Sequence, residues 1–344
     1  IMLKKLSVKN LGCFDDKTYS IDFSEETLIA GPNNSGKSMF LSGVNLMRYF
    51  VITGGLHWST EFYNLVRFEE AVHAHDLERI IWISLTTVEN SEQHIYEMNI
   101  QRTRFNLLKD GKEIGRTPRE IDSMRKLWFF RPNRSPVAFT SRVQATSGPL
   151  QPLNPDGSNV INYLLERWTS RDKKWNATET WLKRIDPDMS EMRTPIIGDQ
   201  VTFETMFGNV PISVSLQGSG FQSATAIIAA VMFSPENSTI IIEEPEVFLH
   251  PDSQEVMCDM INDAVNNQKK QLIFSTHSFN ILKHFFNDIG VEGARRTDSH
   301  ICADPKKFCM YTFKKIAGQV SIERYPLHEK TFRNFRDDFK DIWG

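Results

Sequence analysis

The 344-residue chain has little cysteine: Cys13, Cys258, Cys302 and Cys309 are its only four, and they are widely scattered. Four thiols at such spacings do not form the disulfide framework of a small secreted domain, and Cys302 and Cys309 lack the second ligand pair of a zinc site. No apolar run reaches membrane-spanning length, and no signal-peptide layout opens the chain. We therefore expect buried thiols in a cytoplasmic protein that has no contact with a membrane.

The chain also lacks a strong excess of charge, because 40 Lys+Arg against 43 Asp+Glu leave a net charge of −3. This balance argues against a wholly basic protein that coats DNA, although it leaves room for a local basic patch. We find no internal repeat, no low-complexity tract and no long heptad region that would predict a coiled-coil arm. A chain of this length is able to bury a large core, as one elaborated domain or as two lobes.

What the sequence does contain is a phosphate-binding pattern. Residues 31–38 read GPNNSGKS and fit the P-loop pattern G-x-x-x-x-G-K-[ST]. The apolar run 27–30 predicts a strand before it and residues 39–50 predict a helix after it, a context that disfavours an ordinary glycine-rich turn. In this arrangement backbone N–H groups and the Lys37 ammonium face the phosphates of a nucleoside triphosphate, and the Ser38 hydroxyl binds Mg²⁺. The predicted nucleotide-binding residues are Asn33, Asn34, Ser35, Gly36, Lys37, Ser38 and Met39.

Two adjacent carboxylates follow a strongly apolar run. Residues 240–246 read IIIEEPE, so Glu243 and Glu244 end a predicted buried strand. Ligands bind at the carboxyl ends of such strands in open α/β sheets, and paired acids there are costly unless a cation or a reacting water uses them. We assign Glu243 to Mg²⁺ and Glu244 to orienting and deprotonating the attacking water. The alternative is an exposed acidic loop, which the upstream P-loop disfavours.

A histidine follows a second apolar strand, which is predicted at residues 271–275. The same sheet edge would place His277 within reach of the γ-phosphate as a hydrogen-bond donor. A lone histidine is more often structural, so this role depends on its position. The other histidines show no spacing typical of metal ligands.

A glycine-rich segment, residues 215–222, precedes an apolar helix predicted over residues 223–233. A glycine-rich helix N-terminus is another site for an anion. Because the chain already has its own P-loop, Gly218, Ser219 and Gly220 are expected to contact the nucleotide of a partner protomer. The alternative is a helix cap whose glycines serve only the turn.

The remaining pattern predicts strands and helices around these motifs. Residues 3–8 and 19–23 alternate as half-buried strands, and the Asp110-Gly111 pair predicts a hairpin in an antiparallel meander. A crossover helix at 256–266 joins the two apolar strands of a parallel sheet. The other expected elements are strands at 79–86, 95–103 and 127–130, helices at 159–167 and 178–185, a β section at 200–214, and strands at 310–315 and 320–324.

Together these motifs resemble the ABC-type ATPase superfamily, in particular its branch of OLD-family, RecF-like and SMC-like head domains. The resemblance rests on GPNNSGKS, on GSGFQ at 218–222, on IIIEEPEVFLHP at 240–251 and on FSTHS at 274–278. Residues 249–251 and the run 130–135 point to OLD-like ATPases rather than transporter subunits, and residues 8–11 resemble the first-strand motif of these heads. The resemblance covers nearly the whole chain, to about Tyr325.

This resemblance implies an α/β P-loop NTPase fold, with a mostly parallel core sheet, an antiparallel β subdomain and a helical lobe in one ATPase domain over residues 1–344. Residues 1–139 and 236–325 would form the nucleotide-binding lobe, and residues 140–235 the helical lobe with the signature motif. Residues 326–344 would form a helical tail, in which Phe332, Phe335, Phe339 and Trp343 recur at helical spacing.

The resemblance also implies a homodimer that sandwiches two ATP molecules between the P-loop of one protomer and the Gly218–Gly220 signature of the other. Lys37 would bind phosphate, Ser38 and Glu243 would serve Mg²⁺, Glu244 would be the general base and His277 the switch histidine. Two features depart from the pattern. Glu243 stands where Asp is usual, and residues 216–220 do not follow the usual Leu-Ser-Gly-Gly order. OLD nucleases carry a Toprim nuclease domain after the ATPase, and we expect none in this chain.

We therefore expect a Mg-dependent ATPase that controls a separate effector, a nuclease or a toxin, in a bacterial anti-phage defence complex. This last step rests on family analogy. The alternative is an ATPase of DNA repair or chromosome maintenance that binds DNA, for which the basic candidates are Arg131, Arg134, Arg142, Lys173 and Lys174. A third hypothesis is a nucleotide-gated scaffold in which Glu244 is catalytically idle.

Overall fold

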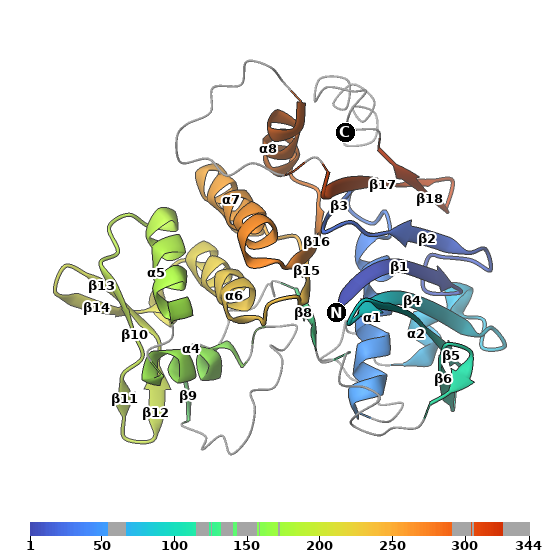
Figure 1. Ribbon diagram of the computed structural model, residues 1–344, viewed down its shortest axis with the longest axis horizontal. Helices are drawn as coiled ribbons and strands as arrows, with labels where there is room; N and C mark the ends of the chain where they lie inside the picture. Colours follow the sequence, from blue (N-terminus) through green and yellow to red (C-terminus); the bar gives the residue numbers. More distant parts are fainter. Residues whose placement is uncertain are drawn as a thin grey trace.

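The computed structural model describes residues 1–53, 67–114, 124, 126–131, 140–142, 157, 159–170, 173–290, 304 and 306–325. The predicted helical tail at 326–344, the run 132–135 that contains Arg134, and Cys302 lie outside this part of the chain. The described strands form two six-stranded sheets and two small three-stranded sheets (Figure 1).

The core sheet carries the motifs at one edge. Its six strands lie in the order β18 (Gln319–Arg324), β17 (Phe308–Ile316), β3 (Glu26–Ala30), β16 (Gln271–Thr276), β15 (Thr239–Glu243) and β8 (Leu127–Phe130). All neighbours are parallel except β18, which returns antiparallel to β17. Every residue of β3, β8, β15 and β16 is buried, as the unbroken apolar runs predict for a sheet covered on both faces.

The second sheet is the predicted antiparallel meander. Its strands lie in the order β2 (Tyr19–Asp22), β1 (Met2–Lys9), β4 (Ile81–Glu89), β5 (Glu92–Ile100), β6 (Phe105–Lys109) and β7 (Lys112–Glu113). The hairpin between β6 and β7 turns at Asp110, with φ 52°, and Gly111, with φ 78°. Two successive positive φ values are what a tight two-residue hairpin needs, so the Asp-Gly prediction is confirmed.

Helix α1 (Lys37–Thr53) packs between the two sheets. Its apolar side chains share one buried cluster with residues of β1 and β4 and with one face of the core sheet, where Ile29, Ile241 and Ile273 lie. The helix begins at Lys37, two residues before the predicted start, so the end of the P-loop pattern already belongs to its first turn. The packing between two sheets buries most of the apolar side chains of this helix.

The opposite face of the core sheet is covered by α6 (Ser219–Phe233), α7 (Pro251–Gln268) and α8 (Phe279–Gly290), and α4 (Val160–Thr169) and α5 (Lys173–Ile185) pack on α6 farther from the sheet (Figure 1). These helices and the strands share one apolar cluster, so the expected helical lobe packs directly on the nucleotide-binding lobe. The exact lobe boundaries stay a prediction. Helix α6 is buried from Gln222 to Phe233, as its lack of charge predicts. Helix α8 is not among the predicted elements.

Short elements complete the described part of the chain. The small sheets are β10 (Glu191–Arg193) with β13 (Glu204–Phe207) and β14 (Val210–Ser213), and β11 (Ile196–Ile197) with β12 (Gln200–Thr202) and β9 (Thr140–Arg142). The short helices are α2 (Phe68–Ala71), η2 (His73–His75) and η4 (Val214–Leu216). None of the described helices is long and apolar enough to cross a membrane.

Candidate nucleotide-binding site

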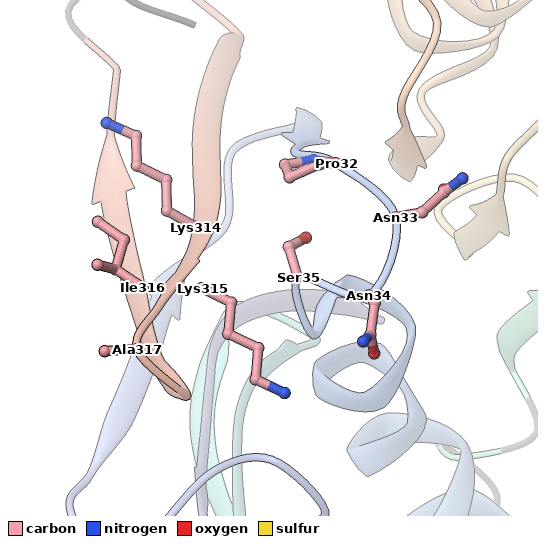
Figure 2. Close-up of a pocket in the computed structure, with 8 residues that line it drawn as sticks. All are labelled: Pro32, Asn33, Asn34, Ser35, Lys314, Lys315, Ile316 and Ala317. Carbon is pink, nitrogen blue, oxygen red and sulfur yellow. The ribbon is translucent and has the colours of Figure 1, made fainter. Parts of the chain in front are cut away.

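The loop between β3 and α1 has the shape of a phosphate cradle. Gly36 has φ +99°, and a Cβ atom there would lie 2.9 Å from the Cys13 sulfur. A Cβ atom at Gly31 would lie 2.5 Å from the Phe313 carbonyl oxygen. Glycine is therefore needed at both positions, once for the backbone conformation and once for the close approach of β17. Figure 2 shows residues 32–35 curving opposite the β17–β18 hairpin.

Ser35 supplies a buried hydroxyl to this loop. Its side chain is 1% exposed, and its Oγ has no hydrogen-bond partner within the described residues. A buried hydroxyl is rarely left without a partner, so a phosphate oxygen in the cradle fits this position. Asn33 and Asn34 lie exposed on the outer bend, where Asn34 adopts a left-handed φ of 63°.

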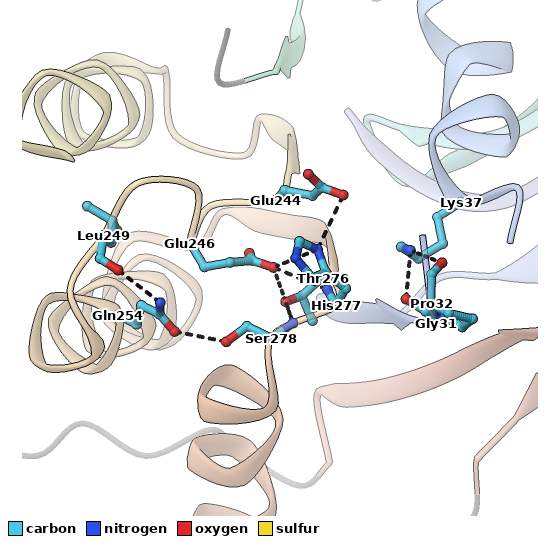
Figure 3. A network of polar contacts seen from close by, with 10 residues as sticks. All are labelled: Gly31, Pro32, Lys37, Glu244, Glu246, Leu249, Gln254, Thr276, His277 and Ser278. Atoms are coloured by element: carbon cyan, nitrogen blue, oxygen red, sulfur yellow. Dashed lines mark hydrogen bonds and ion pairs between the residues drawn. The ribbon is translucent and has the colours of Figure 1, made fainter. Parts of the chain in front are cut away.

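Lys37 closes the loop on itself. Its Nζ donates hydrogen bonds to the carbonyl oxygens of Gly31 at 2.7 Å and Pro32 at 2.8 Å (Figure 3). Burial lowers the pKa of Lys37, while the carboxylates of Glu244, Glu246 and Glu243 act in the opposite direction. The ammonium group is thus within the electrostatic reach of all three acids.

Glu243 ends β15 as the inner member of the acidic pair. It is 2% exposed, and its Oε2 lies 3.3 Å from Nε of Arg131, the residue that follows β8. Strands β8 and β15 are parallel neighbours, so their carboxyl ends bring the two side chains together. A buried carboxylate needs a cation, and in this structure the guanidinium supplies it.

Glu244 pairs with His277. Its φ is 47°, and its amide donates to the Ser275 carbonyl at 2.9 Å, which attaches the residue after β15 to the end of β16. His277 Nδ1 lies 3.4 Å from Glu244 Oε1 (Figure 3). Hydrogen bonding between the two side chains lowers the pKa of Glu244 and raises that of His277. The pair therefore favours a carboxylate beside an imidazolium.

Glu246 is a third acid at this edge, and sequence reasoning missed it. Its Oε1 accepts a hydrogen bond from Thr276 Oγ1 at 2.5 Å and another from the His277 amide at 3.1 Å. The same oxygen lies 3.6 Å from His277 Nδ1. Burial raises the pKa of Glu246. The only sequence signal is its place in the EEPE run directly after a predicted strand.

A chain of hydrogen bonds joins this edge to α7. Thr276 Oγ1 accepts from the Ser278 amide at 2.9 Å, and Ser278 Oγ donates to Gln254 Oε1 at 2.9 Å. Gln254 Nε2 in turn donates to the Leu249 carbonyl at 3.0 Å (Figure 3). The segment after the acidic pair is thereby fixed to the end of β16.

The predicted signature segment lies at the N-terminus of α6. Gly218 is the N-cap residue and Gly220 lies in the first helical turn, while Gly218 and Ser219 are exposed. A Cβ atom at Gly220 would lie 2.5 Å from the Phe248 carbonyl oxygen. The start of α6 therefore packs against the segment after the acidic pair. Its predicted contact with a partner's nucleotide stays a prediction.

The donor set fits Mg²⁺ bound together with a nucleotide. No group of three or more His, Cys, Asp or Glu side chains able to hold a metal occurs in the described part of the chain. Mg²⁺ is usually held by one or two protein ligands, waters and substrate phosphates, so one hydroxyl and one carboxylate, such as the predicted Ser38 and Glu243, would be a sufficient set of protein ligands. In this structure the Glu243 carboxylate pairs with Arg131, and its predicted role in binding Mg²⁺ stays a prediction.

The sheet order brings most predicted residues to one edge. Strands β3, β16 and β15 are consecutive neighbours. The P-loop follows β3, His277 follows β16, and the Glu243–Glu244 pair lies at the end of β15. Met39 follows Ser38 in the first turn of α1, where its side chain occupies the space next to Gly12.

Two of the proposed DNA-facing side chains are engaged within the molecule. Arg131 pairs with Glu243 as described above. Lys174 donates to the carbonyl oxygens of Phe233 and Ser234, at 3.5 and 3.0 Å, and so caps the C-terminus of α6. A basic surface built on these two residues is therefore weaker than their sequence positions suggest.

Comparisons with known proteins agree with this arrangement. The AAA ATPase domain family matches residues 150–282, which include the Gly218 segment, the acidic pair and His277. The chain is 30% identical over 130 residues to the endonuclease GajA of Bacillus cereus, a match covering 31% of this chain and 19% of that protein. It is 23% identical over 328 residues to the OLD nuclease of Thermus scotoductus, covering 80% of this chain and 59% of that protein.

Among solved structures, an SMC head bound to the C-winged helix domain of ScpA superposes with a TM-score of 0.64 at 13% identity. The superposition covers 96% of this chain and 99% of that one. At this identity the likeness concerns the fold. The chain spans less than two thirds of the length of either nuclease it matches. Together these findings confirm the predicted resemblance to OLD-like and SMC-head P-loop ATPases, and with it the predicted fold class.

Proposed function

We propose that this chain hydrolyses ATP with the help of Mg²⁺ at the edge formed by β3, β16 and β15. The observation that carries the proposal is the convergence of Lys37, His277 and Glu244 from the ends of three neighbouring strands. A cradle for phosphate, a general base and a hydrogen-bond donor are the parts that phosphoryl transfer to water requires.

In the proposed reaction, water attacks the γ-phosphorus of ATP. A new P–O bond forms while the bond from the γ-phosphorus to the β–γ bridging oxygen breaks, and Glu244 accepts the proton that the water loses. The lowered pKa of Glu244 keeps its side chain ionised, so a carboxylate is present to accept this proton. His277 donates a hydrogen bond to the γ-phosphate, and Lys37 transfers its hydrogen bonds from Gly31 and Pro32 to phosphate oxygens. Mg²⁺, held by Ser38 and Glu243, would neutralise charge that develops on the phosphates.

We further propose that the active form is a homodimer, with the α6 N-terminus of each protomer facing the nucleotide of the other. Gly218 and Ser219 are exposed at this helix start, where free backbone N–H groups attract an anion. Two apolar side chains nearby are also exposed, Leu216 at 82% and Phe248 at 48%. Exposed apolar groups beside an anion site suit a surface that is covered by a partner.

The proposed biological role is that of the ATPase subunit that controls a separate effector, a nuclease or a toxin, in a bacterial anti-phage defence complex. The support is that two relatives of this chain carry the names endonuclease GajA and OLD nuclease. ATP-dependent dimerisation would then be the signal that the effector receives.

The mass in solution of the Glu244→Gln variant tests the dimer. This variant should bind ATP without hydrolysing it, so we expect Mg·ATP to convert monomer into dimer. The Lys37→Ala variant is the control, because it should stay monomeric under the same conditions. A Glu244→Gln protein that binds ATP and remains a monomer would exclude the sandwich. A dimer that forms equally without nucleotide would exclude ATP as its cause.

The alternative function, an ATPase that binds DNA, is favoured by the SMC-head fold. It predicts that the ATP-bound protein binds DNA with an affinity that falls steeply as salt rises, because each phosphate contact releases counterions. Electrophoretic mobility shifts at two salt concentrations, with and without ATP, distinguish it from the effector-controlling role.

A further inference from the structure

Glu246 is a buried carboxylate that has no part in the reaction proposed above. Its side chain is 5% exposed, and its two oxygens differ in their surroundings. The Oε1 atom is approached by Thr276 and His277, whereas the buried Oε2 atom has no hydrogen-bond partner within the described residues. A buried carboxylate is costly and its oxygens are rarely left without donors, so this residue has acceptor capacity to spare.

The groups that hydrogen-bond to Oε1 of Glu246 are donors. The Thr276 hydroxyl accepts a hydrogen bond from the Ser278 amide at 2.9 Å, so its own proton is available to Glu246, which lies 2.5 Å away. The His277 amide donates to the same oxygen at 3.1 Å. Burial raises the pKa of Glu246, and the charge of His277 acts in the opposite direction. An oxygen surrounded by donors in this way serves as an acceptor.

A tight turn brings Glu246 and Glu244 to the same histidine. The Val247 amide donates to the Glu244 carbonyl at 3.1 Å, and the Leu249 amide donates to the Glu246 carbonyl at 2.9 Å. The turn begins and ends at left-handed residues, Glu244 with φ 47° and Phe248 with φ 67°. Left-handed backbone at residues other than glycine is strained, and strain of this kind gathers at functional sites.

The imidazole of His277 has an acid on either side of one nitrogen. Its Nδ1 lies 3.4 Å from Oε1 of Glu244 and 3.6 Å from Oε1 of Glu246. Figure 3 shows the contacts from both acids meeting at this ring. Because the two distances are nearly equal, a small rotation of the ring is enough to exchange one acceptor for the other.

The proposed reaction creates a need for this second acceptor. While the Nδ1–H group bonds to Glu244, that carboxylate is engaged with the histidine rather than with the attacking water. Glu244 has to turn to the water before it accepts a proton from it. His277 has to keep its place and its charge at the same moment, because it donates to the γ-phosphate.

We propose that Glu246 is a positioning residue that takes over the Nδ1–H hydrogen bond of His277 when Glu244 turns to the attacking water. The proton stays on Nδ1 throughout, and only its acceptor changes. This inference rests on the proposed function, because it takes Glu244 as the base and His277 as the donor to the γ-phosphate. It assigns a role in turnover to an acid that does not touch the nucleotide.

The Glu246→Gln variant of the full chain tests this role by steady-state kinetics. Glutamine keeps an oxygen that accepts hydrogen bonds from Thr276 and from the His277 amide, but it carries no charge. We expect turnover to fall about tenfold and KM for ATP to stay within about twofold, the effect of weakening one charge-assisted hydrogen bond in the reaction alone. Asp252→Asn is the matched control, because it removes one negative charge from a nearby side chain that is 93% exposed. Its turnover should stay within about twofold of the wild type.

The titration of His277 distinguishes this role from simple packing. Glu244 and Glu246 raise the pKa of His277, whereas burial and the charge of Lys37 lower it. Losing the charge of Glu246 should therefore lower this pKa in an NMR titration of the protein with labelled histidine, and Asp252→Asn should leave it unchanged. The loss of turnover in Glu246→Gln should accordingly grow as pH rises. An equal loss at every pH, with an unchanged titration of His277, would overturn the proposal.

Two further variants separate the possible outcomes. If Glu244→Gln turns ATP over as the wild type does, the proposed function is wrong. If Glu244→Gln loses turnover while Glu246→Gln keeps the turnover and the His277 titration of the wild type, the positioning role is wrong and the proposed function stands. Should Glu246→Gln fail to fold, Thr276→Val removes the hydroxyl that fixes Oε1 and leaves both acids in place. It should lose turnover by about threefold, more at high pH than at low pH, and a wild-type pH profile would overturn the positioning role.

Discussion

Replacing Gly220 by alanine should loosen the contact between α6 and the segment after the acidic pair. The added Cβ atom would lie 2.5 Å from the Phe248 carbonyl oxygen, whereas ordinary contacts begin at 3.4 Å. Relief requires a shift of roughly 1 Å in backbone, because no flexible side chain is available to move. The Phe248 segment resists this shift, since the Leu249 amide donates to the backbone carbonyl oxygen of Glu246 at 2.9 Å and Gln254 Nε2 donates to the Leu249 carbonyl oxygen.

We estimate a cost of about 2–3 kcal/mol, the upper part of the usual range for overpacking because the clash is with backbone, reduced by about 1 kcal/mol because alanine favours a helix over glycine. The expected net loss in the free energy of unfolding is therefore about 1–2 kcal/mol. Gly218→Ala is the matched control, because nothing lies within 4 Å of its Cβ position and its φ is −59°. Its stability should stay within about 0.5 kcal/mol of the wild type.

Urea unfolding of the three proteins gives both differences in one experiment. A Gly220→Ala protein as stable as the wild type would refute the packing of α6 on the Phe248 segment. If Gly218→Ala lost as much stability as Gly220→Ala, the glycines would serve only the helix start. In that case the alternative of a simple helix cap would be favoured.

Two further predictions concern the acidic edge. Arg131→Ala removes the cation that pairs with Glu243, so Mn²⁺, used as a probe for Mg²⁺, should bind roughly fivefold more tightly. This is the effect expected for a partly exposed ion pair worth about 1 kcal/mol. A Mn²⁺ titration followed by electron paramagnetic resonance measures this affinity, and weaker binding would contradict the prediction. The pKa of His277 is raised by Glu244, so the stability from this pair is fully present below pH 6.5 and is lost as pH rises through the raised pKa. The stability difference between the wild type and His277→Asn should therefore shrink between pH 6 and pH 9 in urea unfolding, and a difference that grows with pH would contradict the assigned partner.

The core of the fold follows from patterns that physical chemistry makes strong. An unbroken apolar run, such as the one that ends at Glu243, is typical of a strand in a sheet covered on both faces. Strands β15 and β16 are buried in this way. The Asp110-Gly111 pair fixes a tight hairpin because two positive φ values are needed there. The P-loop pattern predicts a strand before it and a helix after it, and both are present.

Element boundaries followed less well from the sequence. Helix α7 begins at Pro251, five residues before its predicted start, with His250 as N-cap. Proline at the first helical position is a start signal that apolar periodicity alone does not reveal. Helix α6 likewise begins at Ser219, so Gly220 lies inside the helix, where its missing Cβ serves packing on Phe248 rather than a loop turn.

The contacts between side chains from different strands of the site were the hardest part to predict from the sequence. That Glu246 binds Thr276, and that Arg131 reaches Glu243, depends on which strands are neighbours in the sheet. Sequence spacing carries no information on such contacts, because the partners are separated by 30 residues in one case and by more than 100 in the other. From the sequence Arg131 is consequently interpreted as a surface charge, whereas in the structure its side chain pairs with Glu243 at the acidic edge.

The rate of ATP hydrolysis by Glu244→Gln, measured together with its ATP affinity, tests the central claim most directly. The account predicts that ATP still binds, because Lys37 and the P-loop are unchanged, while the turnover number falls by about 100-fold or more, the usual effect of losing a general base. A Glu244→Gln protein that turns ATP over at the wild-type rate would contradict the assignment of Glu244 as the base, and with it the proposed mechanism.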